Sequence, residues 1–407
     1  MNAQEANGRG AATPGHRSHR FFLTKRPGGG LTAGRAATVR KLALVLSGAL
    51  ALAIGASGGA SAVAPRGGEH ASSTEIQGSA DGGHAGRIVW TQVLNGQFPR
   101  ARIVSARPDG SGLRVLTHPG PKTVDINAVI SPDGSQVVFE RDPLKGGPAV
   151  VGMVGATGRG EHIVPLPCAS PCAGATDPSW TPDGRRIVFN RVIGPFDGPG
   201  GAARSAVLYT ARLDGSGMRR LSPRGIDGVY EDFHARFAAS GKYLIFARLR
   251  NREFTVAVFR MRPDGSHVRR LTPWRLDADV PDLSLAAHGP TKDLVVFETF
   301  AHGPPKGAQN NIATVPATCH PLAACIRDIR YVTHNVAGPH TTFNPSWSPD
   351  GKRIAFTNAV FPPSGPPVGD IWTMPPNGHA RKRVSHSPRF EFRPDWGPAP
   401  CELRTCR

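Results

Sequence analysis

Polar side chains that could do chemistry recur where short apolar segments of this 407-residue chain begin. They are carboxylates, amides, one histidine and one arginine: Asp125, Asn127, Asp177, Asp232, His234, Asp282, Asn344 and Arg393. Carboxylate and amide oxygens are ligands that Ca²⁺ prefers, so several of these residues together could hold calcium. The alternative is that each caps a strand start or hydrogen-bonds loop backbone, because Asp and Asn are common in turns.

His234 is the member of this set best suited to proton transfer or metal binding. A lone histidine, however, more often serves packing or hydrogen bonding. The Gly-x-Ser-x-Gly string from Gly55 to Gly59 precedes no helical pattern and lies in a segment that we expect to be removed. The sequence contains no Walker-type phosphate loop and no His-Glu-x-x-His metal motif. These observations favour a protein without catalytic activity.

The elements that position these residues follow from an internal repeat. Glycine (49 residues) and proline (39 residues) are abundant, which suits many short strands joined by tight turns. One turn signature, Pro-Asp-Gly between two apolar runs, has three close copies. They are Ile130-Ser-Pro-Asp-Gly-Ser-Gln-Val-Val-Phe139, Trp180-Thr-Pro-Asp-Gly-Arg-Arg-Ile-Val-Phe189 and Trp347-Ser-Pro-Asp-Gly-Lys-Arg-Ile-Ala-Phe356. Weaker copies run from Phe237 to Phe246 and from Leu285 to Phe297.

A second turn signature alternates with the first. Its copies are Asp109-Gly-Ser111, Asp214-Gly-Ser216, Asp264-Gly-Ser266 and Asn377-Gly-His379. Proline fixes φ, Asp caps the turn through its side chain, and glycine takes the positive φ that closes a hairpin. Two hairpin turns in a unit of about fifty residues give four strands per unit, which is typical of a β-propeller blade.

The repeat resembles that of the TolB-type propellers, whose blades carry Pro-x-Trp-Ser-Pro-Asp-Gly-x-x-Ile-Ala-Phe and later an Asp-Gly turn before Leu-Thr. The copy from Asn344 to Phe356 is close to this pattern. The resemblance covers residues 87–398 and implies an all-β, six-bladed β-propeller with four-stranded blades. TolB itself has an N-terminal α/β domain in addition, which we do not expect here.

The first unit lacks its inner strand, and the last residues of the repeat region can supply it. Pro394-Asp-Trp396 matches Pro345-Ser-Trp347 in spacing, so the C-terminal strand should pair in blade one and close the ring. We expect blades at 87–118 plus 390–398, 124–167, 176–222, 231–273, 280–335 and 343–387. Trp180 and Trp347 should fill cores between blades. The polar set named first would then converge at one mouth of the axial channel.

Six cysteines form three close pairs, for which we expect disulfides rather than zinc sites because no pair has the usual two-residue spacing. The pairs are Cys168 with Cys172, Cys319 with Cys325, and Cys401 with Cys406. The first should tie the connection between blades two and three. The second should cross the mouth of a hairpin in blade five, where the Asp-Gly turn is missing.

The N-terminal region indicates export. Arg40 and Lys41 precede the apolar run Leu42–Ile54 and then Ala60-Ser-Ala62, a pattern typical of a secretory signal peptide over residues 39–62. An uncleaved, weak membrane anchor is the alternative. Residues 1–38 are polar and aperiodic, so we interpret them as disordered and as a segment ahead of the true start codon. Residues 63–86 read as a flexible linker, and residues 399–407 as a tail.

Part of the net charge of +19 comes from residues 1–62. Residues after position 62 contain 41 basic and 29 acidic side chains, a net charge of +12. Such a protein would be drawn to anionic surfaces, although arginine-rich usage in a GC-rich genome also explains the number. Export argues against nucleic acid as a partner.

Three hypotheses follow for this exported chain, which we expect to be a monomer. The leading one is a non-enzymatic binding or scaffold protein of the bacterial cell envelope or extracellular space, with a protein or an envelope polymer as partner. The second is a metal-dependent hydrolase or lyase acting on a lactone or polysaccharide at the propeller mouth. The third is a wall-associated structural protein attracted by charge. No cofactor is expected, apart from the calcium considered above.

Overall fold

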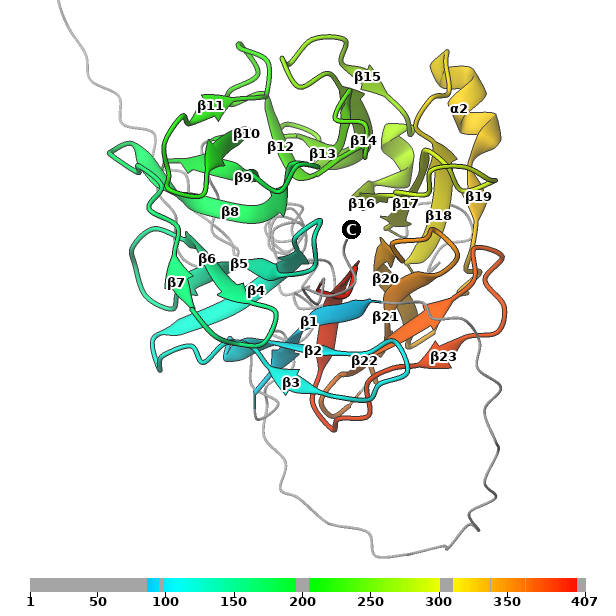
Figure 1. Cartoon of the computed structure of the whole chain (residues 1–407). Helices are drawn as coiled ribbons and strands as arrows, with labels where there is room; N and C mark the ends of the chain where they lie inside the picture. Colours follow the sequence, from blue (N-terminus) through cyan, green and yellow to red (C-terminus); the bar gives the residue numbers. More distant parts are fainter. Residues whose placement is uncertain are drawn as a thin grey trace, which may run out of the picture.

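The computed structural model describes residues 86–94, 99–194, 205–300, 310–336, 338–362 and 364–400. These residues form six four-stranded antiparallel sheets arranged in a ring around one axis, as Figure 1 shows. The six-bladed propeller predicted from the turn signatures is confirmed. The expectations for residues 1–38, 39–62 and 63–85, and for the bridge between Cys401 and Cys406, lie outside the described residues.

Blades one to three contain the following strands. Blade one consists of β24 (Glu391–Gly397), β1 (Arg87–Val93), β2 (Ala101–Ala106) and β3 (Arg114–Val115). Blade two consists of β4 (Thr123–Ile130), β5 (Gln136–Pro143), β6 (Val150–Gly155) and β7 (His162–Ile163). Blade three consists of β8 (Cys172–Trp180), β9 (Arg186–Ile193), β10 (Ser205–Arg212) and β11 (Arg219–Arg220).

Blades four to six have the same order from the axis outward. Blade four consists of β12 (Tyr230–Phe237), β13 (Leu244–Arg250), β14 (Thr255–Met261) and β15 (Arg269–Arg270). Blade five consists of β16 (Ala278–Leu283), β17 (Leu294–Thr299), β18 (Asn311–Pro316) and β19 (Arg330–Tyr331). Blade six consists of β20 (His340–Trp347), β21 (Ile354–Val360), β22 (Val368–Met374) and β23 (Lys382–Arg383).

The ring is closed by its two ends, as the spacing of Pro394 and Trp396 predicts. Strand β24 pairs antiparallel with β1, and Trp396 lies opposite Ile88. This pairing supplies the inner strand that blade one lacks and removes two free sheet edges. The closed ring fixes the position of every inner strand relative to the axis.

Apolar residues of neighbouring blades form the cores. The second strand of every blade contributes one fully buried aromatic side chain: Trp90, Phe139, Phe189, Phe246, Phe297 and Phe356. Trp180 packs with Val129 and Val138 of the preceding blade, and Trp347 packs with Val296 of its preceding blade. Both tryptophans therefore fill cores between blades, as predicted.

Two short helices interrupt the pattern on the outer side of blades four and five. A 3₁₀ helix, η1 (Trp274–Leu276), follows β15, and α2 (Leu322–Asp328) connects β18 to β19. The bridge between Cys319 and Cys325 is confirmed, but it ties the segment before α2 to a residue within α2 instead of crossing a hairpin mouth. Cys168 and Cys172 are bridged in the connection between blades two and three, as expected. Within the described residues we find no helix with the length and apolarity needed to span a membrane.

Candidate functional site

A β-bulge occurs at the same place in all six inner strands. In β4, for example, Ile126 lies opposite Glu140 and Val129 lies opposite Val138, so the inner strand carries one extra residue. In each of the other five blades the inner strand likewise advances by three residues where its partner strand advances by two. A bulge re-aims a side chain locally. Here it directs one residue of each blade toward the axis.

The six residues at the bulges have left-handed backbone conformations. They are Asn127, Asp177, His234, Val280, Asn344 and Arg393, with φ between 45° and 58°. We call them the axial ring. Asn and Asp tolerate this conformation, but it is unfavourable for a β-branched residue such as Val280. Four of the six are followed by proline, which has no N–H to lose where the ladder is interrupted.

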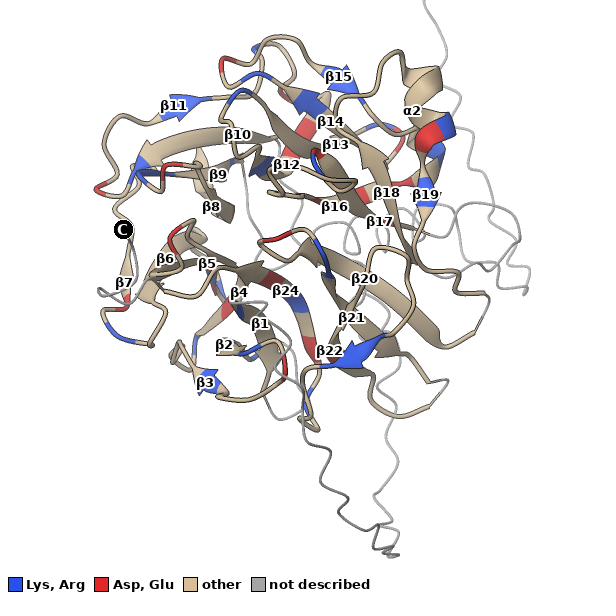
Figure 2. Cartoon of the chain, turned by 45° about the vertical axis from the view of Figure 1, so that its right-hand side comes forward, with Lys and Arg blue, Asp and Glu red and all other residues tan. Residues whose placement is uncertain are grey.

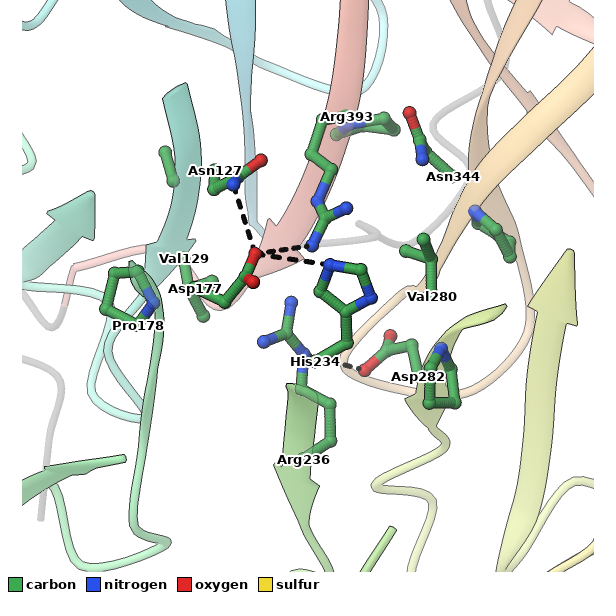
Figure 3. A pocket seen from close by; sticks show the side chains of 14 residues that line it. Asn127, Val129, Asp177, Pro178, His234, Arg236, Val280, Asp282, Asn344 and Arg393 are labelled. Carbon is green, nitrogen blue, oxygen red and sulfur yellow. Dashed lines mark hydrogen bonds and ion pairs between the residues drawn. The ribbon is translucent and has the colours of Figure 1, made fainter. Parts of the chain in front are cut away.

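Asp177 is the hub of the axial ring. Its Oδ1 accepts hydrogen bonds from Asn127 Nδ2 at 3.0 Å and lies 3.2 Å from His234 Nε2 and 3.4 Å from Arg393 Nη2. Figure 3 shows these side chains pointing toward one another from four different blades. Burial alone would raise the pKa of Asp177, but the charges of His234 and Arg393 outweigh burial and lower it. Asp177 is therefore ionised at neutral pH.

His234 is held between two carboxylates. Its Nδ1 lies 2.9 Å from Asp279 Oδ1, and its Nε2 faces Asp177. Burial and the nearby Arg393 favour the neutral ring, but the two carboxylates prevail and raise the pKa of His234. Both ring nitrogens are thus engaged, and a proton bound to His234 is stabilised by charges on either side.

A second layer of carboxyl groups supports the ring from the neighbouring strands. Glu140 Oε2 accepts from the backbone N–H of Asp177 at 2.9 Å, and Glu298 Oε2 accepts from the backbone N–H of Asn344 at 2.6 Å. Each glutamate therefore fixes the bulge of the following blade. Burial, Asp142 and Asp177 raise the pKa of Glu140 well above its usual range. Burial and the charge of Asp279 raise the pKa of Glu298 to about 7.

Two of the predicted site residues lie away from the axial ring. Asp125 receives a two-pronged hydrogen bond from Arg141, with both N···O distances at 2.7 Å. Asp232 is bound in the same way by Arg248, at 2.6 and 2.9 Å, and also accepts from Ser222. Both carboxylates are fully buried inside their blades. Their contacts account for them as structural ion pairs.

Asp282 lies one step along the axis from the ring. Its Oδ1 is 3.4 Å from Arg236 Nε, and Arg236 Nη2 reaches Asp395 Oδ1 at 3.3 Å. Asp282 also accepts from the backbone N–H of Trp347, and Asp395 from that of Ile130. Burial, together with the nearby Asp282, raises the pKa of Asp395 to about 6 despite the opposing charge of Arg236. The three side chains bridge the channel below the axial ring.

The axial ring and this bridge leave little free space between them. The cavity that they line has a volume of about 10 Å³, which is roughly the space of one water molecule. The channel is therefore filled by ion-paired side chains at this level.

Beyond the bridge the channel widens into an apolar funnel of about 370 Å³. Its wall consists of the last residues of the inner strands and of the Pro-Asp-Gly turns. The apolar lining includes Val129, Trp180, Phe237, Leu283, Leu285, Trp347 and Trp396, with Pro132, Pro182, Pro349 and Pro398 around them. The three tryptophan side chains are largely buried between blades, whereas Leu285 at the rim is 47 % exposed.

The axial arrangement does not fit the calcium site that the sequence left open. Calcium needs six to eight oxygen ligands. The oxygen of Asp177 that faces the axis already serves three donors, and the guanidinium group of Arg393 lies among the candidate ligands. In the described part of the chain, no three His, Cys, Asp or Glu side chains are grouped so that they could hold a metal ion.

Comparisons with known proteins support the architecture. No protein-family model and no curated protein sequence matches the chain. Among solved structures, TolB from Acinetobacter baumannii superposes with a TM-score of 0.55 at 17 % identity, over 77 % of this chain and 67 % of that one. A TolB-type protein from Agrobacterium tumefaciens gives 0.50 at 14 % identity, over 77 % of this chain and 99 % of that one. The chain has a TolB-like propeller fold.

A third solved structure is also similar in fold. A chain from a nidogen/laminin complex superposes with a TM-score of 0.52 at 11 % identity, over 78 % of this chain and 100 % of that one. At such identities the likeness concerns the fold, and the function has to be argued from the site.

Sequence reasoning missed Val280, Asp279, Arg236 and Asp395, although they complete the axial arrangement of this TolB-like propeller. One signal could have located the ring positions. The residue directly before Pro-x-Trp is an axial residue at Asp177, and the same position before proline is axial at Val280. Val280 was not predicted because a valine side chain can neither titrate, nor form hydrogen bonds, nor bind a metal.

Proposed function

We propose that this protein is an exported, non-enzymatic binding or scaffold protein, and that its funnel receives an extended apolar segment of a partner protein. The proposal rests on one observation: an apolar, proline-rich funnel of about 370 Å³ whose inner end is bridged by Arg236, Asp282 and Asp395. Pockets of this size and lining are typical of binding sites.

The funnel has the chemistry for an extended peptide rather than for a charged small molecule. Its exposed wall is mainly apolar, and hydroxyls such as those of Ser131, Thr181 and Ser348 already donate to the Asp of their own turns. Most of the binding energy would therefore come from burial of apolar side chains. The floor carries two carboxylates against one guanidinium group. A segment with apolar residues and a single basic side chain at its tip would therefore be complementary.

The axial ring supports binding rather than catalysis. A general base must reach a substrate proton. Both nitrogens of His234 are engaged by carboxylates, and the adjacent free space accommodates about one water molecule. The alternative, a metal-dependent hydrolase or lyase, would need a different arrangement of these side chains. Turnover of a lactone or polysaccharide that is lost in His234→Gln would favour that alternative.

The two disulfides support the proposal of export, because such bonds persist mainly in oxidising compartments. The TolB-like fold is compatible with a partner in the cell envelope or outside the cell. One of the similar propellers comes from a nidogen/laminin complex, so association with another protein is within the range of this architecture.

The test is a selection of peptides from a displayed random library on the purified protein, followed by calorimetric titration of the selected peptides. Leu285 lies at the funnel rim and is 47 % exposed, and Leu113 is 56 % exposed on the outer side of blade one. Leu285→Asp should weaken binding about tenfold or more, because burying a leucine side chain contributes about 1.5–3 kcal/mol. Leu113→Asp is the matched control and should leave binding unchanged. Selected peptides that bind Leu285→Asp as tightly as the parent would contradict the proposal.

A further inference from the structure

Blade four breaks an internal symmetry on its outer side. Arg219-Arg220-Leu-Ser-Pro-Arg-Gly-Ile-Asp227 in blade three aligns with Arg269-Arg270-Leu-Thr-Pro-Trp-Arg-Leu-Asp277 in blade four. The two segments have the same length and the same double arginine on the edge strand. They differ most at two positions, where Trp274 replaces Arg224 and Arg275 replaces Gly225.

In blade three a carboxylate neutralises the edge arginine, whereas the equivalent carboxylate in blade four accepts a backbone hydrogen bond. Arg220 donates to both oxygens of Asp227, at 2.9 and 3.2 Å. The equivalent Asp277 is buried, and its Oδ1 accepts from the backbone N–H of Val256 at 3.0 Å. Arg270 Nε is buried and has no hydrogen-bond partner in the described part of the protein.

Two cations lie against one tryptophan at this place. The guanidinium carbon of Arg270 is 5.3 Å from the ring centre of Trp274, and that of Arg250 is 4.4 Å from it. Arg250 donates to Thr255 Oγ1, and its nearest carboxylate, on the half-exposed Glu253, is 3.7 Å away. Burial, and then the like charge of Arg250, lower the pKa of Arg270.

A pocket opens directly beside these groups. It has a volume of about 420 Å³ and is lined by Tyr230, Phe259, Arg269, Arg270, Trp274, His320 and Leu322. His320 and Leu322 come from blade five, where the α2 loop and its disulfide replace the usual turn. Figures 1 and 2 both show α2 and the basic strand β15 at the outer edge of the ring. The two departures from the repeat therefore build one cavity, which we call the blade-four pocket.

We propose that the blade-four pocket binds an acidic saccharide, with the oxyanion of the sugar held by Arg269 and Arg270 and the sugar ring packed on Tyr230 and Trp274. A guanidinium group presents paired donors that match carboxylate and phosphate geometry. Aromatic side chains supply an apolar surface for the C–H face of a sugar. An exported protein meets such groups as uronic acids or sugar phosphates in polymers outside the cell. The inference is independent of the funnel.

The test is calorimetric titration of the purified protein with a galacturonate trisaccharide, glucose 6-phosphate, neutral maltotriose and inorganic phosphate. At least one acidic sugar should bind ten times more tightly than maltotriose and than inorganic phosphate. The acidic sugar that binds identifies the oxyanion as carboxylate or phosphate. Binding of neither acidic sugar, or equal binding of inorganic phosphate, would overturn the proposal.

Matched variants separate this pocket from general charge attraction. Arg270→Gln should reduce affinity for the bound acidic sugar about tenfold or more, since hydrogen bonds to charged groups contribute more than neutral ones. Arg220→Gln removes the same charge at the equivalent position of blade three, where Asp227 already holds the arginine, and should leave affinity unchanged. Equal losses in the two variants would show that only net charge matters. Thermal unfolding of each variant confirms that it is folded.

Discussion

Replacing Asp177 by asparagine would remove the negative hub of the axial ring while keeping its size. In the native protein the Asp177 carboxylate faces His234 at 3.2 Å and Arg393 at 3.4 Å, and its side chain is 15 % exposed. Breaking a buried ion pair from one side costs about 3–5 kcal/mol. Because asparagine keeps one acceptor oxygen, we expect a loss of about 3 kcal/mol in the free energy of unfolding at pH 6.

The loss should depend on pH in a defined direction. The pKa of Asp177 is lowered, so its contribution is present above its ordinary pKa and constant from pH 6 to 8.5. The pKa of His234 is raised, so its contribution is present below its ordinary pKa and is lost as pH rises through the raised value. The asparagine variant leaves a charged His234 beside Arg393 with Asp279 alone to compensate. Its deficit should therefore become smaller, by about 1 kcal/mol, as the pH rises through the raised pKa of His234.

Denaturant unfolding followed by tryptophan fluorescence at pH 6 and pH 8.5 measures both numbers. Asp328→Asn, at an exposed position at the end of α2, is the control and should change stability by less than about 0.5 kcal/mol. A deficit below about 1 kcal/mol at pH 6, or one that grows toward pH 8.5, would refute the role assigned to Asp177.

Three further changes test the supporting structure. Glu298→Gln should stabilise the fold by about 1–2 kcal/mol more at pH 8 than at pH 4, because the pKa of Glu298 is raised to about 7 and its ionisation therefore opposes folding. Unfolding at both pH values measures this difference, and a loss of stability at pH 8 relative to pH 4 would count against it. Reducing the bridge between Cys319 and Cys325, or replacing Cys319 by serine, should lower the free energy of unfolding by about 2 kcal/mol, as expected for so small a loop. An unchanged melting temperature would contradict this. Gly152→Ala should cost about 1–3 kcal/mol, since a Cβ there would meet the ring of Phe139 at 2.2 Å; a neutral effect in thermal unfolding would show that the ring moves freely.

The turn chemistry explains why the fold could be predicted from the sequence. Pro-Asp-Gly needs a proline φ and a left-handed glycine, and Gly134, Gly184 and Gly351 all have positive φ in the structure. Ring closure was predictable because Trp396 follows proline at the same distance as Trp347. These are local constraints, and they survive in any context.

The site was less predictable because it depends on contacts between distant blades. Asn127, Asp177, His234, Asn344 and Arg393 meet at the axis as their positions suggested. Asp125 and Asp232 do not, because each forms an ion pair with an arginine on the next strand of its own blade. The α2 loop had no repeat to compare with, and a seven-residue helix leaves no clear periodicity. The widening of the channel into a funnel follows from packing alone.

Hydrogen–deuterium exchange with and without a peptide selected on the protein tests the central claim most directly. If the funnel is the binding surface, the peptide should slow exchange in the turns at 131–134, 181–184 and 348–351, and it should leave the outer strands β11 and β15 unchanged. Protection confined to the outer strands, or to the loops at the opposite end of the channel, would contradict the account.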